Sequence, residues 1–217
     1  MQPPASLPDT RGSTRRQAIL EAATDVFLEC GYAGASVDRI VQLAGGSKGT
    51  VYRHFGSKAD LFAEIITALV ARMTAPIRPR QPDETDISAD LAGTLAHFGE
   101  AYLEVLVQPR SLALYRMVMA EGGNFPDLAR VFYERGPGQV AMQLADYLRV
   151  LPAWVRLSGP DPDVVAREFL SLVRSDLHLK ALLGVEIPTA PQRALAVERA
   201  VELFLARYQP APGSRRA

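Results

Sequence analysis

The chain has 217 residues, of which 48% are hydrophobic and 22% charged, and its 24 basic residues balance its 24 acidic ones. This is the composition of an ordinary globular protein, long enough for a buried core, and a zero net charge excludes a general nucleic-acid coat. The single cysteine, Cys30, excludes a disulfide framework and a cysteine-based zinc site. No apolar run reaches the roughly 18 residues of a membrane span, and the N-terminus lacks the apolar core of a secretory signal. We therefore expect a cytoplasmic protein without a membrane partner.

The N-terminal region predicts an arm followed by an amphipathic helix. Residues 1–13 are rich in proline and polar residues, which is typical of a disordered arm. From Ile19 to Cys30 apolar residues recur every three or four positions, the spacing of one helical face, and Gly31 is expected to end that helix.

The stretch from Ser36 to Lys58 predicts a helix-turn-helix. Ser36 can cap a helix over 37–44, Gly45-Gly46 breaks it, and Ser47 can cap a second helix over 48–54. Two short helices joined by a glycine-containing turn suit insertion of the second helix into a DNA major groove. The stretch is also basic: four cations (Arg39, Lys48, Arg53, Lys58) face one anion (Asp38), a local charge of +3.

The rest of the chain predicts a second, larger helical domain. Ser57 and Asp60 form a capping box that starts a connecting helix over 58–75, and a proline-rich linker follows over 76–87. Helices are then expected over 88–107, 109–121, 126–151, 162–183 and 189–208, with a kink or split of the third at Gly136-Pro137, and a tail over 209–217. No segment shows strand alternation, so the predicted fold is all-α with about nine helices: a DNA-binding domain over 14–57 and a second domain over 88–208.

The last two predicted helices carry apolar residues on more than one face. In the final helix Val197, Val201 and Phe204 form one stripe, while Leu195 and Leu203 lie off it. Such a helix needs partners on two sides. A second subunit is one partner that fits, which predicts a homodimer through these two helices; a larger intramolecular core is the alternative.

Residues 15–73 resemble the DNA-binding domain of the tetracycline-repressor (TetR/AcrR) family. The matching residues are Ala22-Ala23, Phe27, Gly31-Tyr32, Ser36-Val37, Ile40, Ala44-Gly45, Ser47 to Tyr52, His54-Phe55, Ser57-Lys58 and Leu61-Phe62. Gly46 departs from the pattern, because the family usually has a small aliphatic residue there. The stretches AEGGNFPDLARVFYERGP and FLSLVRSDLHLKALLG look like the AefR-like branch of C-terminal domains. The resemblance implies a homodimer, an inducer cavity in the second domain and release of a DNA operator on ligand binding.

The expected DNA-contacting residues are Ser36, Ser47, Lys48, Gly49, Thr50, Tyr52, Arg53, His54 and Lys58. By the resemblance, Tyr52, His54 and Lys58 would hold phosphates, with Thr50 and Ser36 nearby. Lys48 is the best candidate for reading a base, since a lysine suits guanine O6 and N7. Gly49 costs its helix about 1 kcal/mol relative to alanine, which either reflects close approach of the DNA or is neutral drift. Whether Arg53 reads a base or holds phosphate stays open.

No catalytic or cofactor motif is present, so we expect neither an enzyme nor a bound cofactor. The three histidines have no metal-like spacing, and a metal site is not expected. By family analogy the residues chosen for the ligand cavity are Phe98, Tyr102, Met119, Tyr133 and His178, which favours a small hydrophobic or aromatic effector. The sequence thus predicts a homodimeric regulator, a repressor rather than an activator, whose partners are double-stranded operator DNA and a small-molecule effector. The alternative is a helical small-molecule-binding or assembly protein that has lost specific DNA binding.

Overall fold

Every regular element in the described part of the chain is a helix, as predicted. The computed structural model describes residues 10–73, 91–151, 157 and 159–208. In this part of the chain the helices are α1 (Thr10–Gly34), α2 (Val37–Ala44), α3 (Lys48–Phe55), α4 (Lys58–Met73), α5 (Leu91–Leu106), α6 (Pro109–Glu121), α7 (Pro126–Arg135), α8 (Pro137–Arg149), α9 (Pro162–Arg174), α10 (Leu177–Leu183) and α11 (Ala190–Arg207). Residues 1–9 of the expected arm, the linker 76–87, the helix start at Ser88 and the tail 209–217 lie outside the described residues. None of the described helices is both long and apolar enough to cross a membrane.

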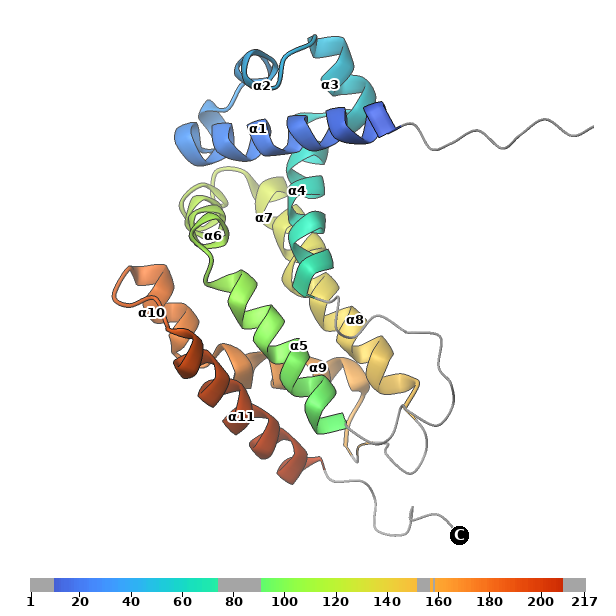
Figure 1. Cartoon of the computed structure of the whole chain (residues 1–217), viewed down its shortest axis with the longest axis vertical. Helices are drawn as coiled ribbons and strands as arrows, with labels where there is room; N and C mark the ends of the chain where they lie inside the picture. Colours follow the sequence, from blue (N-terminus) through green and yellow to red (C-terminus); the bar gives the residue numbers. More distant parts are fainter. Residues whose placement is uncertain (1–9, 74–90, 152–156, 158, 209–217) are drawn as a thin grey trace, which may run out of the picture.

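The helices form two layers joined by α4 (Figure 1). In the upper layer α1 lies beneath α2 and α3, and Phe27, Ile40 and Val51 are buried between them. From this layer α4 descends into the second, where it packs against α5 and α7. The predicted cap of α4 is present, because the Ser57 hydroxyl accepts from the Asp60 amide at 3.1 Å. A single continuous helix therefore belongs to the cores of both layers.

The described residues form two more helices than the nine predicted, because two expected helices are each split. The first splits where foreseen: Gly136 leaves helical geometry at φ −103° and ψ −105°, and Pro137 starts α8. The second split was not expected. Ser175 has φ 43° and ψ −147°, a conformation that few non-glycine residues adopt, and it separates α9 from α10.

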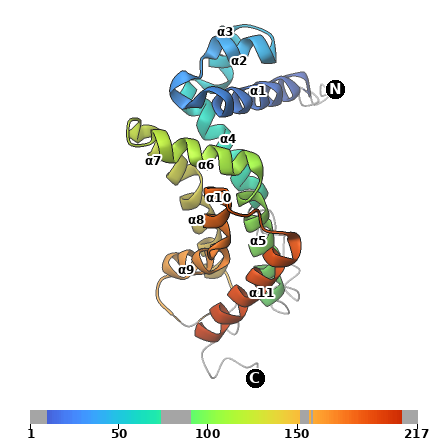
Figure 2. The ribbon, with the colours of Figure 1, turned by 90° about the vertical axis from the view of Figure 1, so that its left-hand side faces the viewer.

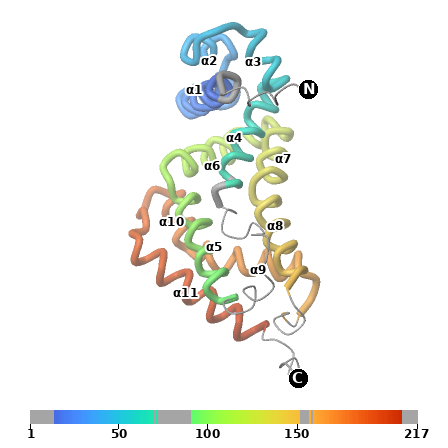
Figure 3. The backbone as a smooth tube through the Cα atoms, turned by 45° about the vertical axis from the view of Figure 1, so that its right-hand side comes forward, coloured from blue at the N-terminus to red at the C-terminus, as the bar shows by residue number. Residues whose placement is uncertain are grey.

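The second layer is held by an aromatic core. Phe98 of α5, Phe169 of α9 and Phe204 of α11 are fully buried, with ring centroids 6.1 Å and 5.0 Å apart along the series. Outside this core, α10 and α11 lie along one edge of the molecule (Figure 3). Six large apolar side chains there are exposed: Leu179, Leu183, Val185, Ile187, Leu195 and Leu203. We call this set the α10–α11 apolar face.

Candidate functional site

Both helices of the helix-turn-helix are capped as predicted. The Ser36 hydroxyl accepts from the Arg39 amide at 3.2 Å, and the Ser47 hydroxyl accepts from the Thr50 amide at 3.2 Å. The Ser47 and Thr50 side-chain oxygens also lie 3.1 Å apart. These two serines fix where α2 and α3 begin, which is a structural role independent of any contact with DNA.

The turn between α2 and α3 is closed by a side chain from α1. Arg15 donates to the Ala44 carbonyl at 2.9 Å and also to the Gly45 carbonyl, the acceptors left free at the end of α2. Its guanidinium lies where a side chain at residue 46 would begin, and Gly46 has φ 89°. Arg15 therefore fills the space that a side chain at residue 46, as in the family pattern, would occupy.

The outward face of α3 carries the predicted reading residues. Tyr52 and Arg53 are exposed, His54 is partly exposed, and Val51 and Phe55 are buried beneath them. The helix lies at the outer end of the upper layer (Figures 1 and 2). Its solvent-facing surface therefore presents hydrogen-bond donors at the end of the molecule farthest from the second layer.

Lys48 and Gly49 lie at the start of the same helix. The Lys48 ammonium is 2.8 Å from an Asp38 carboxylate oxygen on α2, and this hydrogen bond raises the pKa of the lysine. Gly49 is exposed, and a methyl group placed on it would touch only the Ser47 hydroxyl, at 3.7 Å. The folded chain itself therefore gives no packing reason for a glycine at this position.

Lys58 faces inward in this structure. Its ammonium donates to the Tyr32 carbonyl at 2.8 Å and to the Ala35 carbonyl at 3.2 Å, and lies 4.6 Å from the centre of the Tyr32 ring. Burial lowers the pKa of the lysine. Two of its three donors are thus used on main-chain acceptors just before α2, and its predicted phosphate contact would have to use the third.

A contact that the sequence did not reveal joins the two layers. Helix α6 runs under α1 (Figure 2), and Arg110 at its start forms an ion pair with Asp25 of α1. At its end, the Glu121 carboxylate accepts from the amides of Tyr32 at 2.8 Å and Ala33 at 2.7 Å. We call this pair of hydrogen bonds the Glu121 clamp.

The clamp depends on a break in α1. Gly31 has φ 72° and ψ 174°, a region essentially restricted to glycine, and this turns the amides of residues 32 and 33 toward α6. The Glu121 side chain occupies the space that a Cβ at Gly31 would need. Because Glu121 lies almost 90 residues further along the chain, no local pattern could have indicated this partner.

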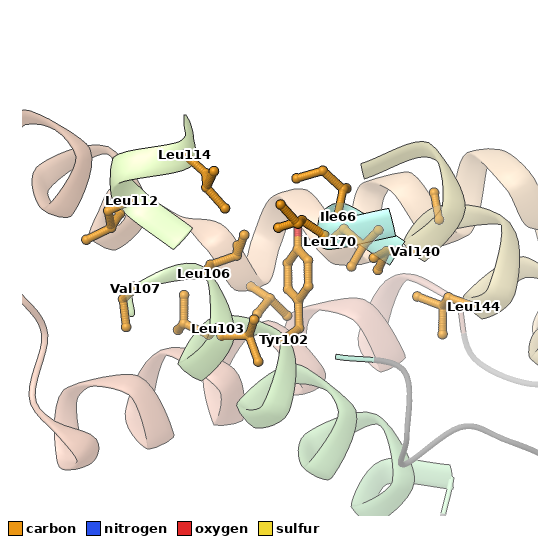
Figure 4. Packing of buried hydrophobic residues seen from close by; sticks show 14 of the residues in the cluster. Ile66, Tyr102, Leu103, Leu106, Val107, Leu112, Leu114, Val140, Leu144 and Leu170 are labelled. Carbon is orange, nitrogen blue, oxygen red and sulfur yellow. The ribbon is translucent and has the colours of Figure 1, made fainter. Parts of the chain in front are cut away.

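The second layer contains a small apolar cavity of about 40 Å³. Its lining comes from α4 (Ile66, Leu69), α5 (Tyr102, Leu106), α6 (Ser111, Leu114, Tyr115), α7 (Phe132), the break at Gly136 and α8 (Pro137, Val140). Tyr102 projects from α5 toward the side where Ile66, Leu114 and Val140 lie (Figure 4). The volume accommodates a few water molecules and is far below the roughly 300 Å³ of a typical ligand pocket.

Only one of the five residues chosen for the cavity lines it. Tyr102 does so, whereas Phe98 is fully buried in the aromatic core. Met119 is 71% exposed on α6, and Tyr133 is exposed with its hydroxyl accepting from Arg167 at 2.8 Å. His178 is buried behind the lining residue Tyr115, with ring centroids 5.0 Å apart. Helical spacing does not distinguish a side chain facing a cavity from one facing the core.

The missed lining residues include two that carry hydroxyls. Tyr115 is one of several aromatic residues in this part of the sequence, and nothing local singles it out. Ser111 gave no signal because a lone serine in a helix is ordinary. Burial raises the pKa of Tyr102 and that of Tyr115, so both phenols stay neutral. Burial also lowers the pKa of His178 to about 4. Among the described residues no cluster of side chains could hold a metal ion.

The two layers correspond to two known domain families. The model for bacterial regulatory proteins of the tetR family matches residues 19–65, and the model for the AefR-like transcriptional repressor C-terminal domain matches residues 93–210. The first span contains the helix-turn-helix, and the second contains most of the cavity lining.

Two relatives that are transcriptional repressors agree with this assignment. The HTH-type transcriptional repressor Rv1474c of Mycobacterium tuberculosis is 30% identical over 193 residues, which are 88% of this chain and 92% of that protein. The repressor AcnR of Corynebacterium diphtheriae is 43% identical over 65 residues, 30% of this chain and only about a third (34%) of AcnR.

Solved structures extend the likeness to the whole fold. The Flavonoid-responsive Regulator FrrA shares 34% identity at a TM-score of 0.72, with 92% of this chain and 99% of that chain covered. A TetR-family regulator from Mesorhizobium loti shares 25% identity with the same TM-score and coverage. The chain therefore belongs to the TetR family of transcriptional regulators.

Proposed function

We propose that this TetR-family regulator is a homodimeric repressor that binds a pseudo-palindromic operator and releases it when a small aromatic molecule occupies its second domain. The main support is α3, a capped helix with exposed Lys48, Tyr52 and Arg53 at one end of the molecule. In this proposal residues 14–57 form the DNA-binding domain, residues 58–75 the connecting helix and residues 88–208 the effector and dimerisation domain.

On the operator, the residues of α3 divide between two tasks. Lys48 exchanges its Asp38 partner for a base edge, and Gly49 leaves room for the groove wall. Tyr52 and His54 contact phosphates, as do the capping serines Ser36 and Ser47 and the nearby Thr50. Arg53 holds either a base or a phosphate. Phosphate contacts supply affinity and base contacts supply sequence preference.

The α10–α11 apolar face is the proposed dimer interface. Its large side chains are exposed in the single chain, with Leu183 and Val185 each about 70% accessible (71% and 70%). Burial of such a face against a copy of itself recovers the free energy of removing apolar surface from water. A two-fold dimer places two α3 helices at a fixed separation, which matches two half-sites of an operator.

The cavity is the proposed effector site, and α6 connects it to the DNA-binding domain. Helix α6 lines the cavity through Ser111, Leu114 and Tyr115 and reaches α1 through the Glu121 clamp. Because the cavity is too small for an aromatic molecule, binding must move its walls. Displacement of α6 would pull on residues 32 and 33, which lie a few residues before the Ser36 cap of α2. The 34% identity to a flavonoid-responsive regulator supports a planar aromatic effector of that kind.

A gel-shift assay against the DNA flanking the gene tests the proposal. The wild-type chain should give a specific shift that competitor DNA of unrelated sequence does not remove, and flavonoids added to the complex should reverse it. If the chain binds aromatic molecules but shifts no DNA, it is instead a helical ligand-binding or assembly protein.

The dimer needs a separate experiment. Leu183→Glu combined with Leu203→Glu should convert the protein to monomers in light scattering and abolish the operator shift. Val150→Glu is the matched control, because Val150 is as exposed (73%) but lies outside the α10–α11 apolar face. A double variant that stays dimeric would show that the interface lies elsewhere.

A further inference from the structure

The cavity contains one buried polar atom whose hydrogen-bonding capacity is unused. Ser111 is 5% exposed and lines the cavity, and its hydroxyl has no hydrogen-bond partner in the described part of the chain. Helical serines usually return this bond to the carbonyl one turn earlier, as Ser171 does at 2.9 Å. Ser111 lies in the first turn of α6, so the residue four positions earlier precedes the helix. A buried hydroxyl without a partner is costly, which points to a partner that enters the cavity.

The remaining walls define what that partner is. Apart from Ser111, the polar side chains of the lining are Tyr102 and Tyr115, and the positive charge of Arg174 acts on the Tyr115 hydroxyl. None of the residues that line the cavity is charged. An ion in such surroundings needs a partner of opposite charge among the lining residues, and Arg174, beside Tyr115, is not one of them, so a charged occupant is disfavoured.

The shape of the walls favours a ring. Tyr115 and Phe132 meet edge to face, with centroids 4.8 Å apart, and both line the cavity. An aromatic occupant can continue this packing with offset or edge-to-face contacts of its own. The cavity is smaller than an aromatic ring, so its walls separate as the ligand enters.

We propose that the effector is a neutral aromatic molecule carrying a hydroxyl group, and that Ser111 is the residue that hydrogen-bonds this hydroxyl. The inference rests on the proposed function in taking the cavity as the effector site. It adds the charge state of the ligand, its polar group and the residue that selects for it. The serine hydroxyl can both donate and accept, so it can pair with a phenol in either direction.

Three probes that share one ring system separate the contributions of ring, hydroxyl and charge. Calorimetric titration of the full chain at pH 7 would use naphthalene, 2-naphthol and 2-naphthoate. We expect 2-naphthol to bind about tenfold tighter than naphthalene, which is the effect of one hydrogen bond to an otherwise unpaired buried group. The carboxylate, 2-naphthoate, should bind at least tenfold more weakly than 2-naphthol.

Two substitutions of nearly equal volume assign the effect to Ser111. Ser111→Thr retains a hydroxyl and should retain the preference for 2-naphthol, whereas Ser111→Val should bind naphthalene and 2-naphthol with equal affinity. Ser171→Ala, which removes an exposed hydroxyl from α9, is the control and should behave as wild type. Thermal unfolding of each variant verifies that it is folded.

The inference is overturned if wild type binds naphthalene and 2-naphthol equally, if 2-naphthoate binds best, if none of the three probes binds, or if Ser111→Val keeps the preference. Equal affinities for naphthalene and 2-naphthol would mean that the Ser111 hydroxyl hydrogen-bonds only to water. Operator binding is measured on the same preparations. A retained gel shift with no preference for the hydroxyl refutes this inference alone. A preference for the hydroxyl without any gel shift refutes the proposed operator binding instead.

Discussion

Removal of the Glu121 clamp is expected to uncouple the two layers. Glu121→Ala deletes two hydrogen bonds from a carboxylate to the amides of Tyr32 and Ala33, at 2.8 and 2.7 Å. A hydrogen bond to a charged group contributes about 1.5–3 kcal/mol when it is buried. Glu121 is only partly buried and Ala33 is exposed, so water replaces much of the loss. We therefore expect a total cost of about 1–2 kcal/mol in the free energy of unfolding.

Two assays measure the effect. Urea unfolding gives the loss of stability, and operator affinity with and without an aromatic effector such as 2-naphthol gives the coupling. Glu121→Ala should still bind the operator, but the effector should weaken that binding several-fold less than in wild type, because movement of α6 no longer reaches residues 32 and 33. The matched control is Glu134→Ala, which removes the same charge from an exposed i,i+4 pair with Arg130 on α7.

The reasoning is refuted if Glu121→Ala and Glu134→Ala behave alike in both assays. Glu121→Gln provides a graded test, because its amide oxygen can accept but carries no charge, and it should fall between wild type and alanine. Gly31→Ala should reproduce the loss of coupling from the other side of the contact. It forces alanine into a backbone region essentially restricted to glycine, at about 1–3 kcal/mol, and places a methyl group against Glu121.

Four further predictions follow from the interface and the core. Gly49→Ala should raise the urea midpoint, because its helix gains up to about 1 kcal/mol, yet weaken operator binding; unchanged affinity would mean that DNA does not approach this position. Lys48→Ala should relax the preference for one base pair by about tenfold in binding assays with operator variants, and a uniform weakening would contradict base reading. Asp38→Asn, which removes the partner of Lys48, should strengthen binding to all sequences. Lys58→Met should lower the urea midpoint because two main-chain carbonyls lose their donor, and should leave the salt dependence of operator binding unchanged; a slope reduced by about one unit would instead place a phosphate on the third donor. The free energy of unfolding should fall by at most about 3 kcal/mol as the pH drops from 6.5 to about 4, because the unfolded chain protonates His178 in this window while burial and Arg174 keep the folded side chain neutral. His178→Gln should lose that part of the pH dependence.

The sequence alone determined the local features of the DNA-binding domain. Each cap joins a serine to an amide three residues later, as Ser36 does with Arg39 and Ser47 with Thr50. Contacts of this range are written in consecutive residues and need no knowledge of the fold. The same holds for the start of α4 at Ser57 and for the break at Gly136. The pattern of residues shared with the TetR family also indicated the family from sequence alone.

Only the tertiary structure decided which residues meet across the chain. Phe98 and Tyr102 are four residues apart and so share a helical face, but this spacing could not show that one lies in the core and the other lines a cavity. Nor could sequence spacing show that Lys58 would turn inward to the carbonyls of Tyr32 and Ala35. The Glu121 clamp and the unpaired hydroxyl of Ser111 depend on where α6 packs against α1, α5, α7 and α10. A sequence read one element at a time contains the side chains of these sites but not the partners that give them a function.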